Sequence, residues 1–271
     1  MRKVRFFRVF VIVLSVVLAT SCSEFRKLQK STDWQAKYQA ALAYYNVGEY
    51  YKASVLLDQV LPVIKGTVDG EKASYYRAYA YYHQKQYILS ASYFKDFSRV
   101  YSRSEWAIES SYMEAYSLYL QSPDYNLDQS STYKAIDAFQ IFLNRNPYTD
   151  YTQKANDMIN EMQVKLETKA FENAKHYHKL ERWEAARVAF ETFENEFPDS
   201  KLNEKVAFLA IDAEFSYAEQ SIRAKQKERY EKTIELYQVF LDKYPNSTML
   251  RDAEKYYIDS VNQIDKLSNR S

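Results

Sequence analysis

Glycine and cysteine are both scarce in this chain of 271 residues, which contains three glycines and one cysteine. With only Gly48, Gly66 and Gly70, the chain has no glycine-rich phosphate loop and no G-x-G-x-x-G fingerprint, which excludes P-loop and Rossmann enzymes. A single cysteine excludes an internal disulfide and a cysteine-based zinc site. The chain has instead 27 tyrosines and 46% hydrophobic residues, so we expect a mostly helical protein with an unusual load of tyrosine.

The first 21 residues have the pattern of a secretory signal. A basic start is followed by the apolar run 9–19, which is short for a permanent membrane span. Small residues then lead into Cys22, which resembles the lipobox of bacterial lipoproteins, although Leu18 stands one place earlier than that pattern prefers. The resemblance implies that Cys22 becomes the mature N-terminus and carries a lipid that holds the protein on a membrane. The alternative is a plain secreted protein with an incidental cysteine.

The charge balance of the predicted mature chain is close to neutral. The full chain has 37 basic and 36 acidic residues, and the predicted signal removes four basic residues, so 33 basic residues remain against 36 acidic ones. A slightly acidic chain argues against nucleic acid as a partner. Ser23 follows the cysteine where an Asp would favour the inner membrane of Gram-negative bacteria, so we expect the outer membrane. Residues 22–32 are expected to form a short lipidated tether.

One pattern recurs five times after the tether. A small residue is followed four positions later by a large residue and three positions after that by another. The occurrences are Ala53/Leu57/Val60, Ser90/Phe94/Phe97, Ala135/Phe139/Phe142, Ala186/Phe190/Phe193 and Thr233/Tyr237/Phe240. Proline follows the last three, as Pro147, Pro198 and Pro245. The small residue lets two helices approach, the spacing keeps the large residues on one face of the helix, and the proline ends the helix. The pattern therefore indicates the second helix of a tetratricopeptide (TPR) unit.

The repeats predict an all-α fold, a TPR solenoid of about five helix pairs with a C-terminal capping helix. The predicted segments are the signal peptide 1–21, the lipidated tether 22–32, TPR units one to three at 33–148, and a C-terminal part at 149–271. That last part combines a linker helix or helix pair, about 151–166, with units four and five and a capping helix at 250–267. Extra residues separate the helices of unit three at 121–132 and those of unit five at 220–229. The alternative is a bundle of generic amphipathic helices, which five matches in register disfavour.

Residues that carry catalytic chemistry are nearly absent. His176 and His178 are two positions apart on a predicted helix, so they point to different sides and cannot share a metal ion, and His83 is isolated from both. The glutamates are typical of solvated helix faces, and a nucleophile elbow needs glycines that this chain lacks. We predict that the protein is not an enzyme, and that it has no metal and no cofactor apart from the covalent lipid on Cys22.

The tyrosines gather on one predicted stripe. In a TPR solenoid, one stripe of each first helix faces the concave groove, and in units one to three eight of its fifteen positions are tyrosine. These candidate groove residues are Tyr38, Tyr45, Tyr75, Tyr79, Tyr82, Tyr112, Tyr116 and Tyr119. Tyrosine offers a large flat apolar surface and a hydroxyl that is satisfied in water, so the stripe suits an extended or aromatic-rich peptide. The alternative is that these tyrosines pack between neighbouring helices.

The same stripe differs in the C-terminal units. In unit four it is expected to contain Thr168, Phe171, Lys175, His178 and Lys179, and in unit five, aligned on Ala213, it is expected to contain Ala207, Ala210, Glu214, Tyr217 and Ala218. The insertion of unit five carries a basic cluster, which is Arg223, Lys225, Lys227 and Arg229. We interpret this cluster as a solvated loop, with docking of an acidic partner as the alternative.

The lipobox, tether, five TPR units and capping helix together resemble the BamD family of outer-membrane lipoproteins. The resemblance covers the whole mature chain. It is most specific in the stretch from Ser122-Pro123 to Ile136, and residues 225–230, Lys-Gln-Lys-Glu-Arg-Tyr, are typical of Bacteroidetes-type members.

The resemblance implies a scaffold and substrate receptor in the outer-membrane β-barrel assembly (BAM) machinery, lipid-anchored at the periplasmic face of the outer membrane. The N-terminal repeats are expected to bind targeting segments of unfolded outer-membrane β-barrel proteins, and the C-terminal repeats are expected to dock the POTRA region of BamA. The alternatives are another periplasmic TPR lipoprotein, such as a pilotin or a peptidoglycan or cell-division factor, and a glycan-binding SusD-like lipoprotein.

Overall fold

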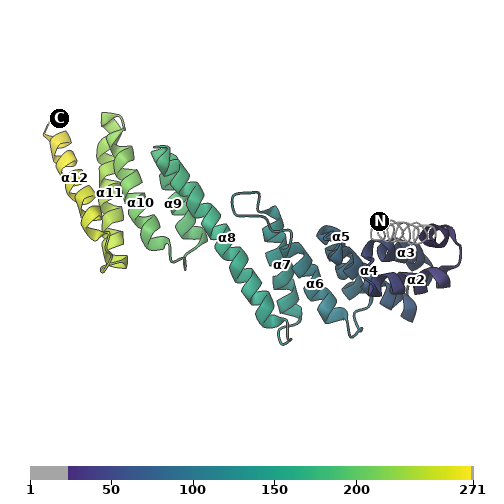
Figure 1. The fold of residues 1–271 in the computed structure, drawn as a ribbon. Helices are drawn as coiled ribbons and strands as arrows, with labels where there is room; N and C mark the ends of the chain where they lie inside the picture. The colour runs from purple at the N-terminus through teal and green to yellow at the C-terminus, as the bar shows by residue number, and fades with distance from the viewer. Residues whose placement is uncertain (1–23, 270–271) are drawn as a thin grey trace, which may run out of the picture. The chain divides into compact units, whose positions relative to one another are not determined.

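A computed structural model describes residues 24–269, and this part of the chain is all-α, with no strand (Figure 1). The helices follow one another as antiparallel neighbours, as expected for a TPR solenoid. Their bounds are α2 (Trp34–Asn46), α3 (Tyr50–Ile64), α4 (Val68–His83), α5 (Tyr87–Val100), α6 (Ala107–Tyr119), α7 (Ser130–Arg145), α8 (Thr152–Lys179), α9 (Trp183–Glu196), α10 (Asn203–Glu219), α11 (Arg223–Lys243) and α12 (Leu250–Ser268).

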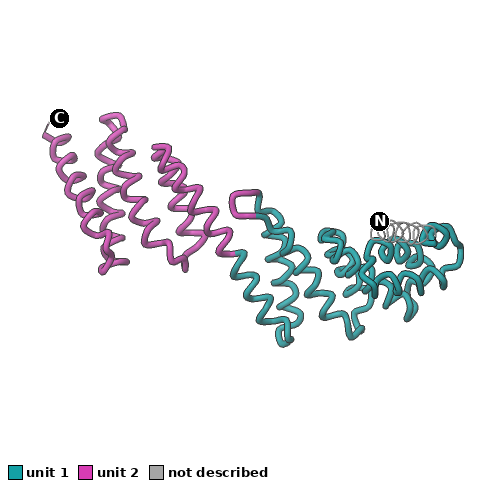
Figure 2. The backbone as a smooth tube through the Cα atoms, viewed as in Figure 1, with its two compact units in different colours: residues 1–123, 128–162 teal, residues 124–127, 163–271 magenta. Residues whose placement is uncertain are grey.

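The helices group into two compact units (Figure 2). Unit 1 contains α2 to α7 and the first part of α8, up to Met162. Unit 2 contains the rest of α8 together with α9 to α12, and it also includes residues 124–127 of the α6–α7 loop. One uninterrupted helix, α8, therefore belongs to both units, and the linker predicted at 151–166 is continuous with the first helix of TPR unit four.

The recurring pattern supplies the cores of the helix pairs. The first large residue of the pattern has no exposed surface in Phe94, Phe139 and Phe190. The second large residue is buried in all five occurrences, which are Val60, Phe97, Phe142, Phe193 and Phe240. Each such side chain contributes about 1.5–3 kcal/mol by leaving water. The exception is Tyr237, which is only half-buried and stacks on Tyr257 of α12, with ring centroids 5.0 Å apart. The predicted fold class is confirmed at the level of individual core residues.

The turn between the helices of a pair repeats its geometry. Gly48, Lys85 and Glu181 each lie two positions before a second helix, and all three have positive φ angles of 81°, 59° and 54°. In each turn the N–H of this residue donates a hydrogen bond to the carbonyl three positions earlier, as Gly48 does to Tyr45. The N–H of the following residue donates to the carbonyl five positions before it, as Glu49 does to Tyr44. This is the hydrogen-bonding of a helix that ends in the left-handed region, where only glycine is free of steric cost.

The prolines act as helix terminators where the sequence predicted. The second helices α7, α9 and α11 end at Arg145, Glu196 and Lys243, each two residues before a proline. In each case the intervening residue is a C-cap whose N–H donates to the carbonyl of the last core phenylalanine.

Two segments differ from the sequence-based expectation. Residues 24–30 are helical, and Phe25 and Leu28 pack against the core of the first helix pair, with Phe25 edge-on to Tyr44. The tether is therefore docked over this stretch. The insertion at 220–229 is also mostly helical, because α11 begins at Arg223, and the predicted loop is reduced to the three residues 220–222.

Candidate functional site

The tyrosine stripe of unit 1 is built by α2, α4 and α6. Tyr38 and Tyr112 are buried, with 3% and 6% of their surface exposed, and they belong to the helix-pair cores. The other six candidates are half-buried, so part of each ring remains accessible. The tyrosines therefore pack on one another, as one of the two interpretations expects. Six of them also keep exposed surface, which a peptide can contact.

Glu109 of α6 ties two tyrosines of α4 to the next repeat. Tyr79 donates a hydrogen bond of 2.5 Å to Oε1 of Glu109, and Tyr75 donates one of 2.7 Å to Oε2. A carboxylate that accepts from two hydroxyls makes charge-assisted bonds, which are stronger than neutral ones. Glu109 therefore fixes the hydroxyl groups of Tyr75 and Tyr79 and helps to order both rings.

Ring contacts continue the stripe along α6. Tyr116 stacks on Tyr112 and on Tyr119 with centroid distances of 5.9 Å and interplanar angles of 9° and 17°. Tyr82 of α4 lies 6.2 Å from Tyr116, which joins the rings of the two helices. Tyr119 donates a 2.7 Å hydrogen bond to Glu161 of α8.

Three aromatic neighbours of the stripe lie outside the set of residues that the helical spacing predicts. Trp106 stacks on Tyr75 at 4.8 Å, Tyr151 stacks on Tyr112 at 4.5 Å, and Tyr76 lies edge-on to Tyr45 at 4.6 Å. The ring of His83, the last residue of α4, stacks on the ring of Tyr50 with a centroid distance of 4.2 Å. Trp106 and Tyr151 each precede a first helix, outside the helical spacing that defined the stripe, so that spacing could not find them.

Burial raises the pKa of several tyrosines of the stripe. It raises the pKa of Tyr38 and Tyr112 to about 12, and burial together with the Glu161 hydrogen bond raises that of Tyr119 to about 12. For Tyr75 and Tyr79, burial and then the hydrogen bond to Glu109 raise the pKa further. Burial lowers the pKa of His83. At neutral pH these phenols are protonated, so what this surface offers is apolar contact and neutral hydrogen-bonding groups.

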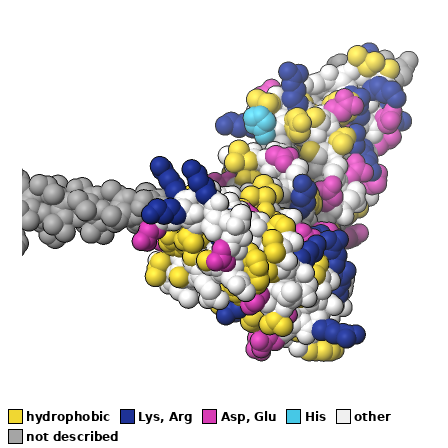
Figure 3. Space-filling model, turned by 90° about the vertical axis from the view of Figure 1, so that its right-hand side faces the viewer, with side chains coloured by type: hydrophobic (Ala, Val, Ile, Leu, Met, Phe, Trp, Pro, Cys, Tyr) yellow, Lys and Arg dark blue, Asp and Glu magenta, His cyan; other side chains and the backbone are white. Residues whose placement is uncertain are grey.

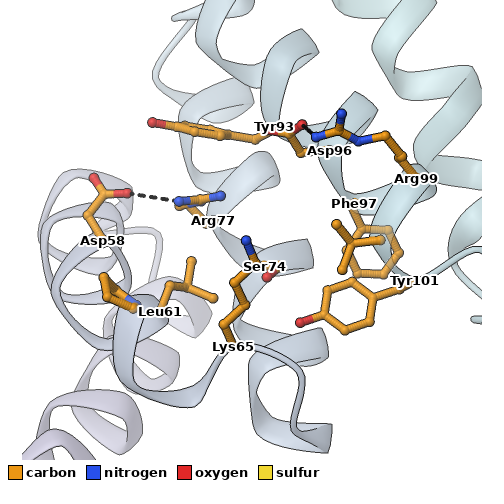
Figure 4. Close-up of a pocket in the computed structure, with 12 residues that line it drawn as sticks. Asp58, Leu61, Lys65, Ser74, Arg77, Tyr93, Asp96, Phe97, Arg99 and Tyr101 are labelled. Atoms are coloured by element: carbon orange, nitrogen blue, oxygen red, sulfur yellow. Dashed lines mark hydrogen bonds and ion pairs between the residues drawn. The ribbon is translucent and has the colours of Figure 1, made fainter.

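A hollow of about 430 Å³ lies in unit 1 between α3, α4 and α5 (Figure 4). Arg77 spans it, with a nitrogen 3.6 Å from Asp58 and its guanidinium 3.8 Å above the ring of Tyr93. Leu61, Phe97 and Tyr101 add apolar surface. None of the eight candidate tyrosines lines this hollow, so it is separate from the stripe.

The basic cluster of unit five does not form a single surface. Arg223 to Arg229 lie on the first turns of α11 rather than in a loop. Lys225 pairs with Glu228 at 2.9 Å, and Lys227 pairs with Glu231 at 3.9 Å. Arg229 turns inward, stacks 3.6 Å above the ring of Tyr217 and donates to its hydroxyl at 2.7 Å. Most of this charge is balanced along the helix, which weakens it as a docking point.

The stripe expected for unit five is misplaced by the alignment on Ala213. Glu214 is 3% exposed and pairs with Arg187 of α9 at 3.1 Å, and Ala210 and Ala218 are buried. Asp212 instead faces α8, where His178 holds it in a 2.7 Å hydrogen bond. Burial favours a higher pKa for Asp212, but hydrogen bonds from His178, Tyr256 and Ser216 outweigh it and hold the pKa below its usual value.

Surface charge, metal sites and membrane spans are three further features of the described residues that bear on the expectations from the sequence. On the face seen in Figure 3, positive, negative and hydrophobic side chains are interspersed. Within residues 24–269, no three His, Cys, Asp or Glu side chains are grouped so that they could hold a metal ion. None of the described helices is long and apolar enough to cross a membrane. Cys22, the predicted lipid attachment point, lies outside the described residues.

Comparison with known proteins gives one family. The family model YfiO, described as outer membrane lipoprotein, matches residues 30–201. No curated protein matches the chain significantly. The family match spans all the helices from α2 to α9, including the tyrosine stripe, and covers more than half of the 271 residues. The chain therefore belongs to the YfiO family of outer membrane lipoproteins, which is the BamD family.

Proposed function

We propose that this protein is the scaffold and substrate-receptor lipoprotein of the outer-membrane β-barrel assembly machinery. A lipid on Cys22 would anchor it at the periplasmic face of the outer membrane. Unit 1 would bind targeting segments of unfolded outer-membrane β-barrel proteins, and the C-terminal repeats would dock the POTRA region of BamA. Membership of the YfiO family supports the membrane and the lipoprotein class. The resemblance of residues 225–230 favours a Bacteroidetes-type member.

The tyrosine stripe is the observation that carries the proposal. Six half-buried tyrosines of three successive first helices form a face whose rings are already ordered by mutual contacts. Ordered rings lose little rotamer freedom when a ligand binds, which favours affinity. Targeting segments of β-barrels are rich in aromatic residues, and each aromatic pair would contribute about 0.5–1.5 kcal/mol beyond its buried area.

The chemistry of the stripe also restricts what it binds. The carboxylates of Glu109 and Glu161 accept hydrogen bonds from tyrosines of the stripe. A bound segment would therefore meet ring faces and edges rather than free charge, and its main-chain groups would remain available to pair with a neighbouring strand or with water. Such a surface tolerates many sequences that share apolar and aromatic side chains, as a receptor for many clients requires. The role needs no bond-making step, in keeping with the prediction that the protein is not an enzyme.

Co-purification tests the proposal as a whole. The tagged full-length protein, extracted from envelopes with mild detergent, is expected to bring down a barrel protein that carries POTRA domains. A photocrosslinking phenylalanine analogue in place of Tyr116 is expected to capture unfolded outer-membrane proteins, whereas the same group at Tyr148, which is 96% exposed on the α7–α8 turn, is not. Absence of a POTRA-bearing partner under conditions that preserve the complex would refute the assignment.

A further inference from the structure

Unit 2 contains a hollow of about 450 Å³ between α8 and α10, which has no role in the proposed function. Its lining is mainly basic: α8 contributes Glu172, Lys175, His176, His178 and Lys179, and α10 contributes Lys205 and Leu209. With neutral histidines, the lining has three positive charges and one negative charge. The hollow therefore has an excess of positive charge although the whole chain is almost neutral.

Two lysines from different helices converge on one aromatic ring. The ammonium group of Lys175 lies 5.1 Å from the ring centroid of Phe171, and that of Lys205 lies 5.6 Å from the same centroid. Phe171 is 6% exposed and belongs to the core of unit 2, so the ring is held in place below them. Cation–π contact holds both ammonium groups above one fixed ring, although like charges repel.

The available carboxylates are already engaged. Glu172 makes hydrogen bonds of 2.8 and 3.0 Å with the Nζ atom of Lys175 on its own helix. Asp212 of α10, next to this part of α8, makes a 2.7 Å hydrogen bond with His178, which lines the hollow. Among the described residues no carboxylate lies within ion-pairing distance of Lys179 or Lys205. One exposed cation on each helix thus lacks a counter-charge.

We propose that this hollow docks an acidic peptide segment of a partner protein, with one carboxylate against Lys179 and another against Lys205. Charge complementarity selects an anionic ligand, and the placement of the two lysines on separate helices suits two carboxylates of one chain better than one small anion. Leu209, which is half-buried at the edge of the hollow, offers apolar contact to the stem of such a segment. This site lies within unit 2 and is independent of the proposed function.

Fluorescence anisotropy with a labelled hexaglutamate peptide tests the site on the full-length protein in detergent at low salt. Hexaglutamine serves as the uncharged comparison peptide. The variant Lys179→Gln/Lys205→Gln removes the two uncompensated charges, and Lys225→Gln/Lys227→Gln on α11 is the matched control, because it removes two exposed lysines that already have partners. Lys179→Arg/Lys205→Arg keeps the charges.

We expect wild type and the arginine variant to bind hexaglutamate in preference to hexaglutamine, and to bind it more weakly as salt is added. The glutamine variant of the hollow should bind about fivefold more weakly or worse, and the control should change less than about twofold, with thermal unfolding unchanged in both. Equal losses in the two glutamine variants, or equal binding of the two peptides, would overturn the proposal. It would also be overturned if inorganic phosphate or phosphatidylglycerol vesicles bound through Lys179 and Lys205 while hexaglutamate did not.

Discussion

At the scale of single residues, Glu109 is central to the tyrosine stripe, because this side chain accepts hydrogen bonds from both Tyr75 and Tyr79 of the preceding repeat. Neither bond could be foreseen from the sequence. The partners are 34 and 30 positions apart, and which helix faces meet is decided by the packing of α4 on α6. By contrast, the burial of Phe94 and Phe139 could be predicted, because the spacing within a single helix determines it.

Replacing Glu109 with Gln should lower the free energy of unfolding by about 1–3 kcal/mol. The amide retains one acceptor oxygen and no charge, so one of the two hydroxyls loses its partner and the other keeps a weaker bond. Urea denaturation of the purified protein measures the change. Glu105→Gln, at an exposed position of the same region, is the control and should change the stability by less than about 0.5 kcal/mol. Equal effects of the two substitutions would remove the special role of Glu109.

Asp212 should make the stability of unit 2 depend on acid pH. Its folded-state pKa is held below the usual aspartate value, so its contribution is present above about pH 4 and is lost as the pH falls through the folded pKa. Asp212→Asn should therefore destabilise the protein at pH 7 by more than it does at the lowest pH where the fold persists. Denaturant titrations across this range measure the difference, with Asp259→Asn, exposed on α12, as the control. A pH-independent difference would contradict the role given to the His178 contact.

At the scale of elements, the turns within helix pairs show what sequence spacing misses. Gly48 marks its own left-handed turn, but Lys85 and Glu181 adopt the same backbone without a residue type that signals it. The register of α10 was misjudged for a related reason. Ala210, Ala213 and Ala218 are all buried, so small residues alone do not identify which of them faces the partner helix. The length of α11 was missed because its basic first turns are polar all round and resemble a solvated loop.

Lys85→Gly should stabilise the protein by about 0.5–1 kcal/mol. A side chain at φ 59° brings Cβ close to the following carbonyl group, and glycine removes this cost, although it also makes the unfolded chain more flexible. The complementary change, Gly48→Ala, should destabilise the fold, because a φ of 81° is favourable only for glycine. An added Cβ would have no atom within 4 Å, so the loss of stability would come from the backbone conformation and not from a steric clash with a neighbour. Urea denaturation of both variants tests the turn geometry, and a destabilised Lys85→Gly protein would contradict it.

At the scale of the whole molecule, the fold class could be predicted from the sequence, but the detailed make-up of the candidate surface could not. Repeated spacing defined the helix pairs, since each pair is a local unit that meets its neighbours in the same way. The tyrosines were identified as a group, but their division into two buried and six half-buried rings required the packing of each first helix on the next. Trp106 and Tyr151 join the surface only because short turns bring them back onto α4 and α6.

The buried tyrosines should make the helical fold unstable at high pH. Burial raises the pKa of Tyr38, Tyr112 and Tyr119 to about 12, above the usual value of about 10. Their neutral forms therefore stabilise the fold below about pH 10, and this stability is lost as the pH rises toward the folded pKa. Ultraviolet absorbance should show a late group of tyrosines that ionise together with loss of helical circular dichroism. Ionisation of all tyrosines near pH 10 with the helices intact would contradict the burial of the stripe.

The most direct test of the central claim is the affinity of the full-length protein for the C-terminal targeting peptide of a β-barrel protein, measured by titration calorimetry. Tyr82→Ala/Tyr116→Ala removes the rings that join α4 to α6, and Tyr133→Ala/Tyr148→Ala removes two tyrosines that are 60% and 96% exposed on and beside α7. Loss of two aromatic contacts should weaken binding about tenfold in the first variant, and the second should remain within about twofold of wild type. Unchanged affinity in the first variant, with its fold intact, would assign the stripe to packing and contradict the account.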